Sequence, residues 1–166
     1  MSDYTLADLT RITGAKRRAV QTWAEAKVIE AEAKTERAGR GTHRRFSRDE
    51  AIIACIVRSF AMRQMSIGEL LNVSNAIRKQ LKKGGVDRKV VDGVIAGTTL
   101  GYLILVTIAK RSWRCTILEA ELSKVGGADQ LFSNIGAVAS EHAEKFGAMA
   151  TVICLNTYLK ELGDPF

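Results

Sequence analysis

The chain has few cysteines, and none of them is placed for metal binding or for a disulfide framework. Its 166 residues contain only three, Cys55, Cys115 and Cys154, which lie far apart in apolar segments. No two of them have the short spacing that is typical of zinc ligands. The sequence therefore predicts buried free thiols in a reducing cytoplasm, with no metal site and no other cofactor.

Long hydrophobic runs are absent as well. The longest, 103–109, is far too short to cross a bilayer, and the first residues lack the apolar region of a secretory signal. There is also no glycine-rich phosphate loop and no nucleophile motif. We therefore expect a cytoplasmic protein that has no membrane contact and is not an enzyme.

What the chain does have is a basic first half. The net charge is +7, of which residues 1–65 carry +5 and residues 66–90 carry +4, whereas residues 91–166 carry −2. An extended basic surface on one part of a chain is typical of nucleic-acid binding. A solvated basic face without a partner is the alternative interpretation of the same pattern.

One capping signature occurs three times in the first half. It is a hydroxyl residue followed three positions later by an acid, so that side chain and backbone satisfy each other at the start of a helix. The pairs are Thr5 with Asp8, Ser47 with Glu50, and Ser66 with Glu69. We therefore expect helices to begin at these three places.

The first two helices have the order of a helix-turn-helix motif. Apolar residues at helical spacing predict a helix over 5–13 that ends at Gly14. A basic helix follows over 16–26, with Val20 on one side. Its opposite side carries Lys16, Arg17, Arg18 and Gln21. Three cations at the start of a helix oppose its dipole, so a bound anion would remove the conflict.

The rest of the first half reads as a wing followed by two helices. A short strand is expected at 28–29, a polar mobile hairpin over 30–43 and a returning strand at 44–46. A long helix then begins at Ser47 and another at Ser66. Because paired glycines end this last helix, 1–83 is predicted to be one domain.

The second half, 86–166, is predicted to be a small α+β module, which makes the whole chain α+β. Asp87 caps a short helix through Ile95, and strands at 101–109 and 113–121 form a hairpin. A helix over 129–146, a strand over 151–155 and a closing helical turn follow. This module is expected to dimerise the chain or to bind a small-molecule or protein effector.

The first 70 or so residues resemble the DNA-binding domain of the MerR family of transcriptional regulators, a winged helix-turn-helix. The matching positions are Tyr4, Thr5, Leu6 and Leu9 near the start, Thr13 and Gly14 in the turn, Val20 and Trp23 in the second helix, Val28 and Ile29 entering the wing, Gly41 to Ser47 leaving it, and Met65, Ser66 and Ile67 at the fourth helix. The resemblance implies a regulator that binds double-stranded DNA as a homodimer.

The resemblance also implies roles for individual residues. The exposed face of the second helix would read bases in the major groove, and Trp23 would lie near the phosphate backbone. The wing would grip phosphates with His43, Arg44 and Arg45. Two of these roles have a structural alternative, because Trp23 could be a core residue and either Arg44 or Arg45 could pair with an acid on the following helix.

Several departures from the family limit what is implied. Gln21 to Ala24 replace the usual Arg-Tyr-Tyr-Glu, and the loop over 30–43 is somewhat long for the wing. The long dimerising helix is cut short at Gly84, and the cysteine cluster of the metal-sensing members is missing. Two other functions stay open, namely an excisionase-like protein that bends DNA, and an adaptor whose basic face binds an acidic protein.

Overall fold

The computed structural model describes residues 4–36, 44–109, 112–120, 133, 136–137, 140 and 150–162. The fold is α+β, with two antiparallel sheets among the described residues. The chain divides into two compact units, Met1–Arg78 (unit 1) and Lys79–Phe166 (unit 2). This division lies inside helix α5 (Ile67–Lys83), whereas the sequence placed a domain boundary at Gly84–Gly85.

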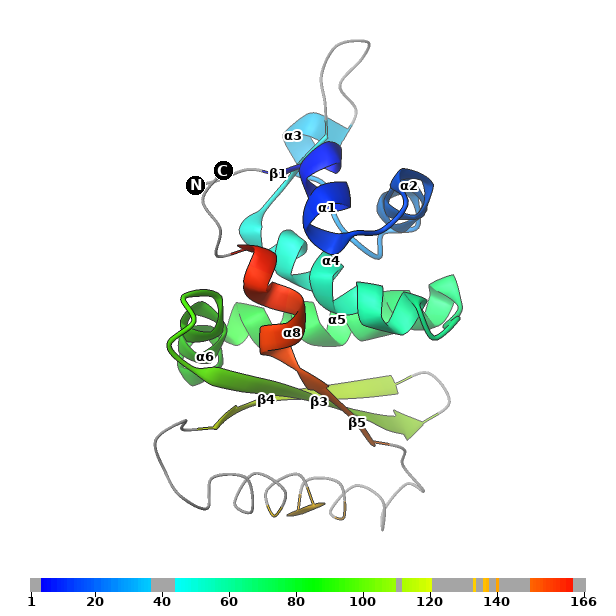
Figure 1. Cartoon of the computed structure of the whole chain (residues 1–166). Coiled ribbons are helices and arrows are strands. Elements are labelled where there is room, and N and C mark those ends of the chain that lie inside the picture. The colour runs from blue at the N-terminus through cyan, green and yellow to red at the C-terminus, as the bar shows by residue number, and fades with distance from the viewer. Residues whose placement is uncertain are drawn as a thin grey trace. The chain divides into compact units, whose positions relative to one another are not determined.

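Unit 1 contains the helices that the sequence predicts, in the predicted order (Figure 1). Its elements before α5 are β1 (Tyr4–Thr5), α1 (Leu6–Thr13), α2 (Arg17–Glu25), α3 (Ala33–Glu36), β2 (Arg45–Phe46) and α4 (Arg48–Ala61). Helix α1 packs against both α2 and α4. The order of helix, turn and basic helix is therefore present in the fold.

Two of the three predicted capping boxes are complete. The backbone N–H of Asp8 donates to Thr5 Oγ1 at 3.2 Å, and the N–H of Thr5 donates to Asp8 Oδ2 at 2.8 Å. The same reciprocal pair joins Ser66 and Glu69 at 2.9 and 3.3 Å. The hydrogen bond from the Thr5 hydroxyl lowers the pKa of Asp8, and the one from the Ser66 hydroxyl lowers the pKa of Glu69. Both carboxylates are therefore charged at neutral pH.

The third box is only half formed, which corrects the prediction. The N–H of Glu50 donates to Ser47 Oγ at 3.3 Å, but the Glu50 carboxylate does not return to Ser47. It is buried and accepts two hydrogen bonds from Arg78, at 2.7 and 3.0 Å, and one from the backbone N–H of Glu30 at 2.8 Å. Pairing this carboxylate with the buried guanidinium of Arg78 stabilises the fold more than its return to the Ser47 backbone would.

The strand pairing at the base of the predicted wing also differs from the expectation. Residues 28–29 form a bend, and β2 pairs instead with β1, Tyr4 opposite Phe46. The outgoing segment joins the same strand through a bridge between Ala31 and Phe46 and a 2.8 Å hydrogen bond from Glu32 N–H to the Arg45 carbonyl. Val28 and Ile29 are fully buried, so they serve the core and do not extend a sheet.

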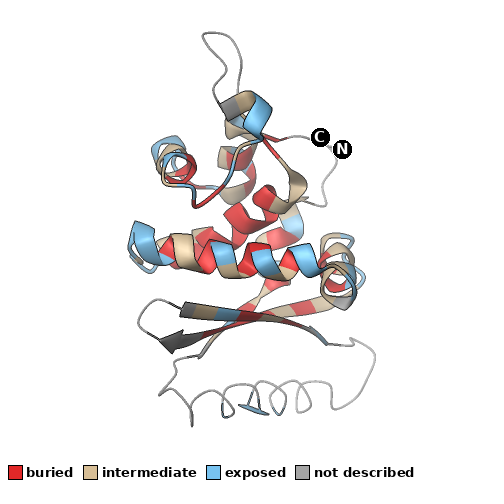
Figure 2. Cartoon of the chain, turned by 180° about the vertical axis from the view of Figure 1, so that it is seen from behind, coloured by how far each residue is buried: buried red, intermediate tan, exposed pale blue. Residues whose placement is uncertain are grey.

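Helix α4 is the buried element of unit 1. Its residues from Glu50 to Val57 are all buried, as is Phe60 (Figure 2). A helix that is apolar on every side lies inside a core, because no face of it can gain by meeting water. Helix α5 also buries apolar side chains, among them Leu70, Val73 and Ile77.

Among its described residues, unit 2 contains a three-stranded antiparallel sheet against which helices pack. The elements are α6 (Val86–Ile95), β3 (Leu100–Ala109), β4 (Ser112–Ala120), β5 (Ala150–Cys154), α8 (Leu155–Leu159) and a 3₁₀ turn (Lys160–Leu162), with strand order β4-β3-β5. The predicted hairpin and third strand are confirmed. Helices α6 and α8 pack on β3 (Figure 1), where a Cβ added at Gly101 would lie 2.5 Å from the Val94 side chain.

Two details of unit 2 differ from the sequence-based expectation or lie beyond the described residues. Asp87 does not cap α6, because Gly85 occupies the N-cap and Asp87 accepts a 2.6 Å hydrogen bond from the Gln80 amide. The helix predicted over 129–146 lies largely outside the described residues.

The three cysteines are free thiols, and two of them have the burial that the sequence predicts. Cys55 and Cys115 are buried and Cys154 is partly exposed. Burial raises the pKa of Cys115 to about 12, with a further contribution from the Asp87 charge. This thiol therefore stays protonated and unreactive at neutral pH.

Candidate nucleic-acid interface

A tight turn sets the angle at which α2 leaves α1. Gly14 ends α1 with φ at +61°, a left-handed conformation that glycine adopts without strain. The guanidinium of Arg58, on α4, donates to the carbonyls of Thr13 at 3.2 Å and of Gly14 at 3.4 Å. These bonds satisfy carbonyls left unpaired at the end of α1, so they hold the turn and thereby position α2.

The first turn of α2 attracts anions. Lys16 occupies the N-cap but makes no side-chain capping bond, and the turn contains no acid. Lys16, Arg17 and Arg18 are exposed, and none of them forms an ion pair with a described residue. The positive end of the helix dipole and three cationic side chains therefore coincide at one point of the surface, as the sequence indicated.

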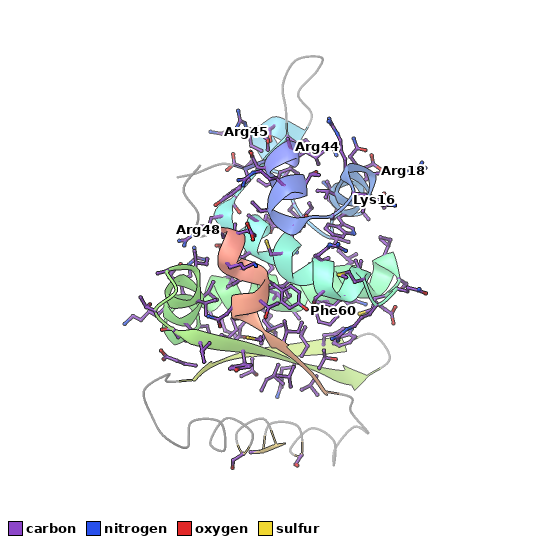
Figure 3. The ribbon with its side chains drawn as sticks, in the orientation of Figure 1. Lys16, Arg18, Arg44, Arg45, Arg48 and Phe60 are labelled. Atoms are coloured by element: carbon purple, nitrogen blue, oxygen red, sulfur yellow. The ribbon has the colours of Figure 1, made fainter. Side chains whose placement is uncertain are left out.

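A shallow concavity brings part of this cationic face together with the base of the predicted wing. It has a volume of about 530 Å³, and its lining includes Arg17, Gln21 and Glu25 from α2, Arg44 from the segment before β2, and the start of α1. Lys16 and Arg18 lie on α2, while Arg44 and Arg45 lie near the start of α1 (Figure 3). Residues distant in the sequence thus share one surface.

The two described wing arginines stay available for a partner. Arg45 is exposed and Arg44 is partly exposed, and neither forms an ion pair within the described part of the chain. Pairing with an acid on the following helix, the structural alternative, is not observed there. The backbone N–H of Arg45 donates to Thr35 Oγ1 at 2.9 Å, which fixes the strand, and the Arg45 charge adds to the effect of the Thr5 hydrogen bond in lowering the pKa of Asp8. His43 lies outside the described residues.

Trp23 is a core residue, which corrects its expected place beside the DNA backbone. It is only 3% exposed, so its ring cannot reach a phosphate. Its carbonyl accepts hydrogen bonds from the N–H groups of Val28 at 2.8 Å and Ile29 at 3.3 Å, which closes the end of α2. The core interpretation of this residue is therefore the one that the structure supports.

Two residues of this region escaped the sequence analysis. Glu25 lines the concavity, and its signal was present, because it follows Arg17 and Gln21 at the four-residue spacing of one helix face. The role of Arg58 could not be predicted, because its contact to Thr13 joins residues 45 positions apart and no local pattern in the sequence encodes it.

Other kinds of site find no support in the described residues. These residues contain no group of three side chains able to hold a metal ion, and none of their helices is long and apolar enough to cross a membrane. Neither the scan of protein-family models nor the search of curated proteins found a match for this sequence.

Proposed function

We propose that this protein is a sequence-specific transcriptional regulator that binds double-stranded DNA through unit 1, a winged helix-turn-helix of the MerR type. The observation that carries the proposal is the shared surface of Arg17 and Gln21 on α2 with Arg44 at the base of the wing. An uncapped, cationic helix start next to this surface adds attraction for phosphates.

The proposed mechanism uses two kinds of contact, one with phosphates and one with bases. Lys16 and Arg18, together with the first N–H groups of α2, bind phosphates and set the position of the protein on the duplex. Arg17 and Gln21 lie one helical turn apart and read bases in the major groove, where arginine pairs with guanine and glutamine with adenine. Arg58 positions this helix through the turn that it holds.

Equilibrium binding at several salt concentrations tests the function. A duplex chosen by selection from random DNA is compared with a scrambled duplex of the same length. We expect affinity for both to fall steeply with salt, with the selected duplex bound more tightly throughout. Binding that shows no preference would favour an architectural role, and no binding at low salt would favour the adaptor.

The wing arginines should contribute affinity without sequence preference. We expect Arg44→Ala and Arg45→Ala each to weaken binding to both duplexes alike and to lower the salt slope by about one, because each removes about one phosphate contact. Lys89→Ala is the matched control, since Lys89 is an exposed cation on α6 of unit 2. An unchanged slope in both wing variants would remove them from the interface.

We further propose that unit 2 makes the protein a homodimer. In the described sheet, β4 and β5 occupy the two edges of the order β4-β3-β5, and an edge strand can pair with a second copy. Light scattering of the full chain should give twice the mass of the 18.1 kDa monomer. The dimer should bind DNA with two half-sites more tightly than DNA with one. A monomeric mass at binding concentrations would contradict this.

A further inference from the structure

We infer that Glu25 is a specificity-determining residue whose carboxylate accepts a hydrogen bond from the amino group of a cytosine in the major groove. The inference rests on the proposed function, because it assigns a base to a residue of the same interface. Glu25 is an acid that lines the same concavity as Arg17 and Arg44.

Glu25 belongs to one continuous stripe of α2. Arg17, Gln21 and Glu25 follow one another at four-residue spacing, and all three line the concavity. At a rise of 1.5 Å per residue, the stripe from Arg17 to Glu25 is about 12 Å long. That length matches about three base-pair steps of 3.4 Å, so each of the three side chains can meet a different base pair.

The carboxylate of Glu25 has no partner within the described part of the molecule. It is exposed, and no described residue forms an ion pair or hydrogen bond with it. The last turn of α2 contains no basic residue, so Glu25 lies unopposed at the negative end of the helix dipole. When DNA binding removes water from it, the carboxylate is repelled by phosphates and needs a hydrogen-bond donor in place of that water.

The major groove offers such a donor in a distinctive place. An ionised carboxylate only accepts hydrogen bonds. Cytosine presents an N4 amino donor with no acceptor of its own in the major groove, adenine presents its N6 donor beside the acceptor N7, and guanine presents only the acceptors N7 and O6. Glu25 therefore favours cytosine and rejects guanine at the same position. The two ends of α2 also differ in charge, cationic at Arg17 and anionic at Glu25, which fixes the direction of the helix along the groove.

The test is a selection of bound sequences with the full chain and three variants. Glu25→Ala should lose the cytosine preference at one position, about a 5- to 30-fold loss of discrimination there, and should keep the preferences set by Arg17 and Gln21. Glu25→Gln should change the preferred base at that position, because an amide both donates and accepts. Glu32→Ala, an exposed acid outside the concavity, is the matched control and should keep the wild-type profile.

The outcomes separate this inference from the function on which it rests. If the wild type selects a sequence but Glu25→Ala selects the same one and binds all DNA more tightly, Glu25 only repels the backbone and the inference is overturned alone. If the wild type selects no sequence, the proposed function and the inference fail together. Circular dichroism of each variant confirms that α2 is still folded.

Discussion

Replacing Glu50 with alanine is expected to destabilise unit 1 by about 3–5 kcal/mol, since it removes the buried counter-charge of Arg78 and leaves only the half-exposed carboxylate of Glu30, 3.4 Å away. Arg78 is 7% exposed and Glu50 6%. The guanidinium also donates to the Val28 carbonyl at 3.2 Å and to Asn75 Oδ1 at 2.7 Å. Burial lowers the pKa of Arg78, but the hydrogen bond and charge of Glu50 outweigh it and raise that pKa, so Arg78 stays charged.

Urea unfolding followed by the fluorescence of Trp23, in a Trp113→Phe background, measures the effect on unit 1. Arg78→Met should destabilise by a similar amount, because it leaves the Glu50 carboxylate buried with only the N–H of Glu30 to bind. The double variant Glu50→Leu with Arg78→Met should recover most of the loss, since it buries no unpaired charge.

The control for these variants is Glu32→Ala, which removes an exposed acid and should change the free energy of unfolding by less than about 0.5 kcal/mol. If the single variants also cost less than this, water reaches the pair and the buried network does not hold α4 and α5 to the segment after α2. A double variant as unstable as the singles would mean that the site cannot repack around apolar side chains.

Local signals in the sequence predicted most of the elements correctly. The helix starts at Thr5 and Ser66, the turn at Gly14 and the β3–β4 hairpin each depend on residues within a few positions of one another. Such patterns encode hydrogen bonds that the chain makes with itself nearby. They therefore identify elements without any knowledge of how those elements pack.

Most of the errors come from contacts between distant residues. The Glu50 side chain pairs with Arg78, 28 residues away, instead of completing the cap, and no local pattern in the sequence predicts that pairing. Trp23 could have faced either DNA or the core, and only packing decides that. The cationic face of α2 was visible in the sequence, whereas its approach to Arg44 is a property of the folded unit.

Arg17 and Arg18 are neighbours in the sequence, but the structure predicts different losses when each is replaced. Arg17 lines the concavity beside Gln21, whereas Arg18 is exposed and does not line it. We expect Arg17→Ala to cost about 1–3 kcal/mol of binding to the selected duplex and to relax the preference at one base pair. Arg18→Ala should instead weaken binding to the selected and scrambled duplexes equally.

Both variants should gain stability while they lose DNA binding, because each removes a cation from the positive end of the α2 dipole. Titration of the two duplexes and urea unfolding of the same preparations measure the two effects side by side, with Lys89→Ala as the control that should change neither. Replacing a residue whose role is to stabilise the fold would instead lower the free energy of unfolding. A cation at this position opposes the dipole of its own helix unless a phosphate or base is bound. Removing it should therefore lower the affinity for DNA and raise the free energy of unfolding. If both variants bind the selected duplex like the wild type, α2 does not meet DNA, and the interface must be sought elsewhere on the chain.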